Sequence, residues 1–295
     1  MSEWIMENTD EAVIKIEGLN KKLGGFSLNN IDLAIPKGYI TGFIGRNGAG
    51  KTTTIKAILN MLKPDSGKVE VFGLDAEKHE AEIKSRLGIV IGESGLLGDM
   101  KAGKLAKKLE KLYDKWDDRL FKEYTSRFGV DLDKKISEFS TGTKMKLAIC
   151  IALSHGAELY IFDEPTAGLD PVVRDEILDL LREIIRDEDK TVFFSTHITS
   201  DLDKIADYIV LIESGRIVFN SEKDELIEEY RVIKGGMSAL TPELKDKTLR
   251  YEESGYGFKG LIKAADIPRG DRGYVIERPN VEEIMLAKWK LDRGE

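Results

Sequence analysis

Short apolar runs alternate with amphipathic stretches through roughly the first three quarters of the chain. The apolar runs cover residues 39–44, 68–72, 159–162, 191–194 and 208–212, and several are apolar on both faces. Such runs are typical of strands buried in a partly parallel sheet, and the stretches between them predict helices. The pattern therefore predicts an α/β layer architecture.

Residues 95–155 interrupt this alternation, because nearly all of the segment favours helix. Leu105, Leu109, Leu112 and Trp116 follow one another at i, i+4, i+7 and i+11, which places them on one helical face. We expect this face to pack on the core rather than on a partner. The interleaved lysines predict a solvated face rather than a nucleic-acid site: Lys101, Lys104, Lys107, Lys108 and Lys111. The segment is predicted to be a helical insertion.

The pattern changes again after about Val232. Gly235-Gly236 and Thr241-Pro242 are turn or linker signals. Short strands are predicted within residues 249–261 and 274–276, and a final helix over 280–289 with Asn280 as its N-cap. The chain is therefore predicted to divide into a large unit over 11–232 and a small α+β accessory domain over 233–295.

Composition excludes several classes of protein. The 295 residues carry 45 Lys and Arg against 53 Asp and Glu, a net charge of −8, which argues against a general nucleic-acid binder. One cysteine, Cys150, cannot support a disulfide framework within the chain. Because there is no apolar stretch of membrane-spanning length and no apolar signal core near residue 1, we expect a cytoplasmic location.

A glycine-rich run from Gly45 to Thr53 follows the first of these strands and fits the pattern G-x-x-x-x-G-K-[ST]. Its glycines let the backbone N–H groups curl around a phosphate, and the positive end of the next helix, predicted over 54–62, points to the same place. Lys51 is predicted to neutralise the β- and γ-phosphates, and Thr52 to offer a hydroxyl to Mg²⁺. The predicted nucleotide-binding residues of this run are Gly45, Asn47, Gly48, Ala49, Gly50, Lys51, Thr52 and Thr53.

Two further strand ends carry candidate chemistry. The strand at 159–162 runs into Asp163 and Glu164, at the strand end where α/β folds place ligands. We expect Asp163 to hold Mg²⁺ and Glu164 to act as the base that activates water. The run Ser195-Thr196-His197 follows another apolar strand, and His197 is placed to assist at the γ-phosphate.

These motifs, in this order and spacing over residues 11–230, resemble the ATP-binding subunit of an ABC transporter. The resemblance adds a signature segment at 139–144, which precedes an apolar helix, and it implies a P-loop cassette with a mixed-sheet core and a helical subdomain over about 95–155. It also implies a head-to-tail dimer in which Ser140 and Gly142 of one chain close on the nucleotide of the other. Asp170 would then lie at the dimer seam. The implied cofactor is Mg²⁺ bound with ATP.

The sequence departs from the family pattern in three places. Thr141 and Thr143 stand in the signature where the family usually has Gly and Gln. The family's glutamine near residue 92 is missing, so either Glu93 replaces it as a metal ligand or water fills the gap at Gly92. Leu23 holds the place of the adenine-stacking aromatic, which leaves Phe26 either as the stacking residue or as part of the core.

The signature, the run at 195–202 and the tail at 277–285 are similar to those of ATPases that export antimicrobial or cytolytic peptides, such as the bacitracin-resistance and phenol-soluble-modulin exporters. This resemblance implies a membrane-spanning permease partner, a second ATPase chain that is identical or different, and a place at the cytoplasmic face of the membrane. The alternative is a soluble ABC ATPase of translation or DNA maintenance. DNA-maintenance ATPases carry long heptad coiled coils, and translation factors carry two cassettes, neither of which this sequence shows.

Overall fold

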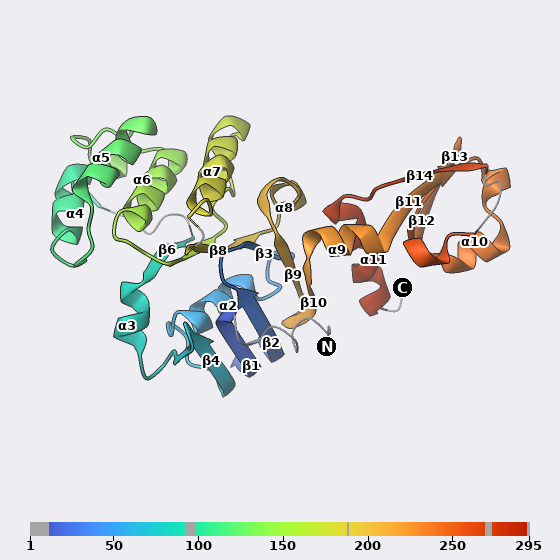
Figure 1. The fold of residues 1–295 in the computed structure, drawn as a ribbon, viewed down its shortest axis with the longest axis horizontal. Helices are drawn as coiled ribbons and strands as arrows, with labels where there is room; N and C mark the ends of the chain where they lie inside the picture. Colours follow the sequence, from blue (N-terminus) through green and yellow to red (C-terminus); the bar gives the residue numbers. More distant parts are fainter. Residues whose placement is uncertain (1–11, 93–97, 188, 269–272, 294–295) are drawn as a thin grey trace.

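A six-stranded sheet forms the centre of the computed structural model, which describes residues 12–92, 98–187, 189–268 and 273–293 (Figure 1). Its order is β10-β9-β3-β8-β7-β6, and its pairs are parallel except β9 with β10. The strands are β3 (Ile40–Ile44), β6 (Leu87–Ile91), β7 (Leu159–Asp163), β8 (Thr191–Thr196), β9 (Tyr208–Glu213) and β10 (Arg216–Glu222). Four of the five predicted strands lie here, and the predicted α/β architecture is confirmed.

A second, antiparallel sheet covers one side of the central sheet, and the sequence pattern did not predict it. Its order is β2-β1-β4-β5, with bounds Phe26–Pro36, Ala12–Leu23, Ser66–Val71 and Leu74–Asp75. The predicted strand at 68–72 belongs to this sheet rather than to the parallel one. A buried cluster between the two sheets contains Ile14, Leu33, Phe43 and Phe193, together with Ile55 of α2 (Lys51–Ile58). Helix α3 (Glu80–Ser85) follows the antiparallel sheet in the chain.

The opposite side of the central sheet is covered by α6 (Thr141–Leu153), α7 (Pro171–Ile184) and α8 (Thr199–Ile205). The predicted helical insertion is present and consists of α4 (Ala102–Leu109), α5 (Asp118–Arg127) and α6, with a buried cluster around Phe121 and Leu147. No helix in the described ranges combines the length and the apolar composition needed to cross a lipid bilayer.

The predicted apolar stripe of this insertion does not continue as one helical face beyond Leu109. Helix α4 ends at Leu109, so Leu112 does not continue the helical face, and its side chain is 74% exposed. Leu105 packs against the insertion's core, as expected, and Trp116 reaches the same core from the loop before α5. The reason is that the chain leaves the helix through turns at residues 110–112, which breaks the 3.6-residue period.

A third sheet lies at the C-terminal end, in the order β12-β13-β11-β14 (Figure 1). Its strands are β11 (Tyr230–Gly235), β12 (Thr248–Ser254), β13 (Gly257–Lys263) and β14 (Tyr274–Glu277), preceded by α9 (Lys223–Glu229). Helix α10 (Pro242–Lys247) and α11 (Val281–Arg293) complete this part of the chain. It contains the predicted strands and final helix, and β11 in addition.

The predicted division after residue 232 falls inside β11, and α11 returns to the cassette. The buried side chains of Val281, Ile284 and Ala287 belong to the same apolar cluster as Leu202 of α8. The Val281 N–H also donates to Asp203 Oδ1 at 3.0 Å. The two parts thus share a core, and independent folding of the accessory domain stays a prediction.

We predict that Ile284→Ala destabilises the whole chain in a single unfolding transition. Ile284 is fully buried in the shared cluster, so the truncation should cost about 2–5 kcal/mol. Thermal unfolding followed by circular dichroism measures this. Leu286→Ala on the same helix is the control, because Leu286 is 38% exposed and should change stability much less. Two separate transitions, with only one shifted by Ile284→Ala, would show that the C-terminal part folds independently.

Candidate nucleotide site

The carboxyl ends of three adjacent strands, β3, β8 and β7, meet at one edge of the central sheet, where ligands bind in open α/β folds. The glycine-rich loop follows β3, Glu164 follows β7 and His197 follows β8. In the register of the sheet, Asp163 lies opposite Ser195, and Ile44 opposite Thr196. The predicted site residues on these segments are therefore neighbours, although more than a hundred residues separate Lys51 from His197.

The phosphate loop is fixed by glycines at positions that other residues could not fill. Gly50 has φ +118°, and a Cβ there would lie 2.8 Å from Leu28 and 3.0 Å from Phe26. A Cβ at Gly45 would lie 2.4 Å from the carbonyl oxygen of Ile212. Helix α2 begins directly at Lys51, three residues earlier than predicted, because Gly50 supplies the turn into it. Its N-terminal N–H groups point into the loop, which suits an anion.

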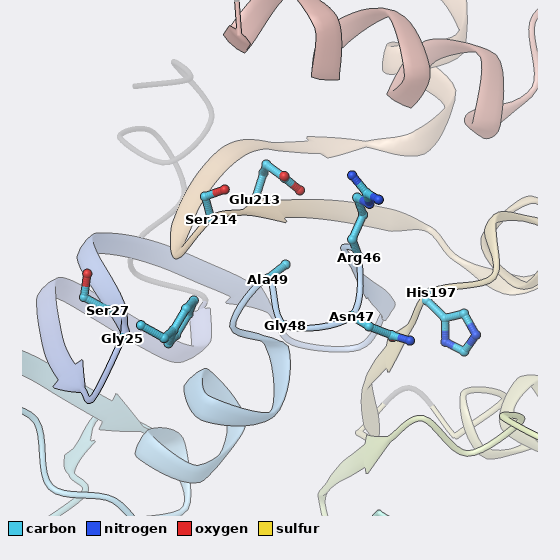
Figure 2. A pocket seen from close by; sticks show the side chains of 10 residues that line it. Gly25, Ser27, Arg46, Asn47, Gly48, Ala49, His197, Glu213 and Ser214 are labelled. Atoms are coloured by element: carbon cyan, nitrogen blue, oxygen red, sulfur yellow. The ribbon is translucent and has the colours of Figure 1, made fainter.

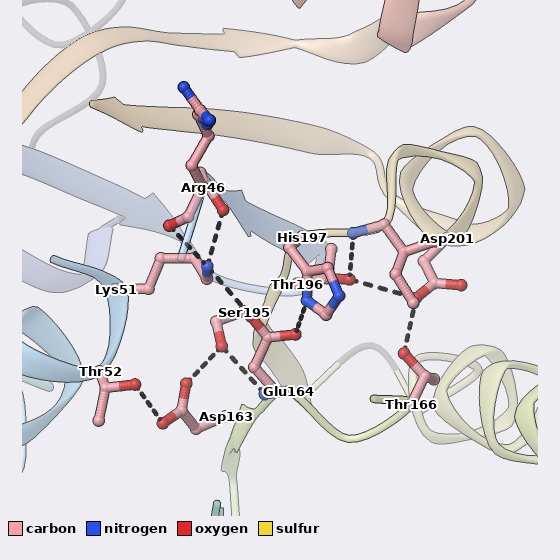
Figure 3. A network of polar contacts seen from close by, with 12 residues as sticks. Arg46, Lys51, Thr52, Asp163, Glu164, Thr166, Ser195, Thr196, His197 and Asp201 are labelled. Carbon is pink, nitrogen blue, oxygen red and sulfur yellow. Dashed lines mark hydrogen bonds and ion pairs between the residues drawn. The ribbon is translucent and has the colours of Figure 1, made fainter. Parts of the chain in front are cut away.

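Lys51 is held inside this loop by three oxygen atoms. Its Nζ donates to the carbonyl oxygens of Gly45 at 2.7 Å and Arg46 at 3.3 Å, and lies 3.0 Å from Glu164 Oε1. The side chain is only 6% exposed, so its charge is compensated by Glu164 and by carbonyl dipoles (Figure 3). An incoming phosphate provides the same compensation, and it lets Lys51 exchange one anionic partner for another.

Asp163 is a buried carboxylate bonded through both oxygens. Thr52 Oγ1 donates to Oδ2 at 2.8 Å, and Ser195 Oγ donates to Oδ1 at 2.5 Å. The three side chains come from α2, β7 and β8, as Figure 3 shows. A hydroxyl beside a carboxylate is an oxygen donor pair of the kind that Mg²⁺ takes when phosphates and waters complete its shell. The residues present thus fit the predicted metal.

Glu164 adopts a backbone conformation that is unusual for a residue other than glycine, with φ +55°. Such a residue costs on the order of 1–3 kcal/mol and persists only where its surroundings fix it. Here the Glu164 N–H donates to both Ser195 Oγ at 3.0 Å and Ser195 O at 3.2 Å. Its Oε2 lies 2.7 Å from His197 Nδ1. The turn directs the carboxylate away from Asp163 and between Lys51 and His197.

A second buried carboxylate, Asp201, fixes the segment around His197. Its Oδ2 accepts from Thr166 Oγ1 at 2.7 Å and Thr196 Oγ1 at 3.3 Å, and its Oδ1 from Arg174 Nε at 2.7 Å. Asp201 is fully buried, and the guanidinium of Arg174 compensates its charge. Asp201 thereby ties together the loop after Glu164, the end of β8 and α7.

Two hollows flank the phosphate loop. One of about 600 Å³ lies over Lys51 and Thr52 and is also lined by Leu23, Phe26, Glu164 and His197. The other, of about 660 Å³, lies on the other side of the loop against Gly25, Arg46, Glu213 and Ser214 (Figure 2). Phe26 and His197 line both. The first hollow can hold a nucleotide with its phosphates at the loop and its base near Leu23 and Phe26.

The remaining predicted residues lie elsewhere or outside the described residues. Ser140 caps α6, where its Oγ accepts from Thr143 N at 3.1 Å, and Asp170 caps α7. A Cβ at Gly142 would lie 3.4 Å from Val173, so the signature segment and the start of α7 are side by side. Within the described part of the chain no hydrogen bond or ion pair joins these residues to the phosphate loop. Gly92 follows β6 in a turn with φ +61°, and Glu93 lies outside the described residues.

The sequence matches known proteins of the ABC transporter family. The sequence pattern of the ABC transporter family matches residues 28–167. The bacitracin transport ATP-binding protein BcrA of Enterococcus faecalis is 34% identical over 297 residues, which cover 95% of each chain. The chain belongs to the ABC transporter ATP-binding family. As a member of it, the protein is an ATPase that binds ATP and couples its hydrolysis to transport.

Two further relatives agree with this assignment. The lantibiotic transport ATP-binding protein SrtF of Streptococcus pyogenes is 32% identical over 222 residues, covering 74% of this chain and 95% of SrtF. The solved structure of cbiO1 from Clostridium perfringens, part of the ABC transporter complex cbiONQ, has a TM-score of 0.63 at 25% identity. It covers 74% of this chain and 92% of its own, which confirms the cassette fold.

Sequence reasoning missed the supporting residues Ser195, Asp201 and Arg174. The sequence places Ser195 in the run that ends at His197 but assigns it no role. The available signal was its place in register with Asp163 at the end of a parallel strand, where a polar side chain inside an apolar run needs a partner. Asp201 and Arg174 carried a weaker signal, because a charged residue on a helix is usually exposed.

We predict that Ser195→Ala lowers the ATPase rate about 10- to 100-fold, the range typical of groups that orient a ligand carboxylate. The change removes the hydroxyl that bonds both Asp163 Oδ1 and the Glu164 N–H. Steady-state phosphate release measures the rate. Thr191→Val is the matched control: Thr191 is a buried hydroxyl on the same strand whose oxygen accepts from Gly38 N, outside the site. Equal rates for the Ser195 variant and the native chain would contradict the assignment.

Proposed function

We propose that this chain hydrolyses Mg²⁺-bound ATP to drive a membrane permease that exports peptides or antimicrobial compounds. The observation that supports hydrolysis is the cluster of Lys51, Thr52, Asp163, Glu164 and His197 at one sheet edge. The observation that supports the substrate class is the 95% mutual coverage with a bacitracin transport protein, which extends beyond the cassette into the C-terminal part.

In the proposed reaction, Glu164 accepts the proton of the water that attacks the γ-phosphate. When Lys51 pairs with the phosphates instead of with Glu164, the Oε1 of Glu164 loses its cationic partner. This oxygen is then available to that water. His197 holds the other carboxylate oxygen through its 2.7 Å contact and thereby fixes its direction. The conformation of Glu164 thus serves to present its carboxylate to the nucleotide rather than to the metal.

Mg²⁺ would be held by Thr52 and Asp163, and it supplies charge neutralisation of the phosphates when bound. The contact of these two side chains, at 2.8 Å, keeps both oxygens at one place. Glu93 remains the candidate for a further metal ligand in place of the missing glutamine, with water at Gly92 as the alternative.

A second ATPase chain would complete the site. In a head-to-tail pair, the N-terminus of α6 with Ser140 and Gly142 would face the γ-phosphate bound by the partner's phosphate loop, and Asp170 would lie at the seam. This proposal is supported by the position of the two segments, which lie together on one surface formed by the starts of α6 and α7. A permease would place the dimer at the cytoplasmic face of the membrane.

The soluble alternatives are less well supported. The helices between β6 and β7 have 8, 10 and 13 residues, whereas a DNA-maintenance ATPase needs a long coiled coil at this place. One phosphate loop and one Asp-Glu strand end are present in the sequence, whereas a translation factor has two sets. Co-purification from detergent extracts separates these classes, since a transporter subunit is recovered with an integral membrane protein and a translation factor with ribosomes.

We predict that Glu164→Gln lowers the ATPase rate by about 10²–10⁴ without weakening ATP binding, because the amide keeps the shape but accepts no proton. Single-turnover hydrolysis and calorimetric titration with ATP measure the two effects. Glu80→Gln is the control, a carboxylate bonded to Asn60 and Lys84 away from the site, and it should leave both unchanged. Native-rate hydrolysis by the Glu164 variant would overturn the proposed mechanism.

For the contact with the adenine base of ATP, we predict that Phe26→Leu raises the KM for ATP by roughly 5- to 100-fold. Stacking of a nucleic-acid base on an aromatic ring contributes about 1–3 kcal/mol. Leucine keeps apolar volume beside Gly50 and Leu28 while the ring is lost. Leu23→Ala, on the same hollow, should have a smaller effect. An unchanged KM combined with a lower melting temperature would assign Phe26 to the core instead.

A further inference from the structure

The charge of the chain is distributed very unevenly. Residues 95–155 contain 13 Lys and Arg against 9 Asp and Glu and so carry +4, whereas the whole chain carries −8. The remaining residues therefore carry −12. The helical insertion is therefore basic, whereas the rest of the chain is acidic. Its outermost helix in Figure 1 is α4.

Helix α4 has one apolar face and one face of lysines. Ala102 and Ala106 are buried against the insertion's core. Lys104, Lys107 and Lys108 follow one another at i, i+3 and i+4, which places them on one side of the helix, and all three are exposed, as is Lys111. Lys111 lies just beyond the helix, where its N–H still donates to Lys108 O at 3.3 Å and continues the turn.

None of these four lysines forms an ion pair with any residue that the structure describes. Lysines elsewhere on the surface do so, among them Lys63 with Glu77, Lys78 with Asp75 and Lys84 with Glu80. Even Lys101, at the start of the same helix, lies 3.3 Å from Asp133. No direct ion pair therefore compensates these four charges, and the nearest carboxylates in the hollow that Lys104 and Lys107 line are Glu110, Asp118 and Asp133.

An exposed apolar side chain adjoins this lysine face. Leu112 follows Lys111 directly and is 74% exposed. Lysines beside an exposed large apolar side chain suit a membrane surface, where the charges meet headgroups and the apolar group meets the acyl boundary.

We propose that the face formed by Lys104, Lys107, Lys108 and Lys111, with Leu112 beside it, binds the anionic lipid headgroups of the membrane leaflet. Lysine is a hydrated point charge on a flexible stem and suits a diffuse layer of mobile anions, whereas a fixed carboxylate on a folded partner favours the planar fork of arginine. The inference rests on the proposed function, since it concerns how a transporter ATPase lies against its membrane. It adds a contact that is independent of the permease.

The test is co-sedimentation of the full chain, without nucleotide, with phosphatidylcholine vesicles and with vesicles that are half phosphatidylglycerol. We expect binding to the anionic vesicles only, and its loss at about 0.5 M salt, where charges are screened beyond about 4 Å. Replacing the four lysines by glutamine should lower the partition coefficient at least 30-fold, because each lysine near an anionic surface contributes about fivefold. Leu112→Ala should lower it less.

In a charge-matched variant, glutamine replaces Lys63, Lys68, Lys78 and Lys84. Its partition coefficient for the anionic vesicles should stay at or above half of the native value. Equal loss in both quadruple variants, or no difference between the two vesicle types, would overturn the proposal. Binding to neither vesicle would do so as well, and would leave an acidic protein surface as the counterpart of these lysines. The assay needs neither ATP nor a permease, so its failure leaves the ATPase assignment untouched, and both variants keep the residues of the nucleotide site.

Discussion

The site depends on one buried carboxylate, Asp163, whose two oxygens both accept hydrogen bonds. Asp163 lies at the end of β7, is 2% exposed, and is bonded by a hydroxyl from each side, Thr52 and Ser195. A buried charge without such bonds would cost several kcal/mol. Because its two donors come from the phosphate-loop helix and from β8, satisfying Asp163 also sets the distance between those elements. The conformation of Glu164 follows, since the same Ser195 hydroxyl accepts its N–H.

The sequence predicts this edge well because the chemistry of phosphate binding leaves little freedom. Gly45, Gly50, Lys51 and Thr52 are required by backbone curvature and charge, and their spacing is local, so they can be recognised without a structure. Asp163, Glu164 and His197 were found because each follows an apolar strand. The supporting bonds of Ser195 and Asp201 depend on strand register and helix orientation, which arise only when distant segments pack.

The same distinction explains the errors in the fold. The stripe from Leu105 to Trp116 has a helical period in the sequence, but the turns after Leu109 are decided by how α4 meets α5, which no local pattern records. The antiparallel sheet was missed for a similar reason: β1 and β2 mix polar and apolar residues, and their apolar positions become a buried face only through pairing with each other and with β4. The division after residue 232 rests on a change in composition and stays a prediction, although β11 extends across the boundary.

The packing of α11 on α8 has a mechanical consequence. Helix α8 begins two residues after His197, and its Asp201 clamps the loops that carry Glu164 and His197, while its Leu202 shares a core with Val281 and Ile284. Two neighbouring residues of the short helix therefore contact the loops of the water-activating residues and α11, and α11 in turn packs on β12 and β13. A displacement of that sheet, far from the nucleotide in sequence, would reach the residues that handle the γ-phosphate through two packed helices, α11 and α8.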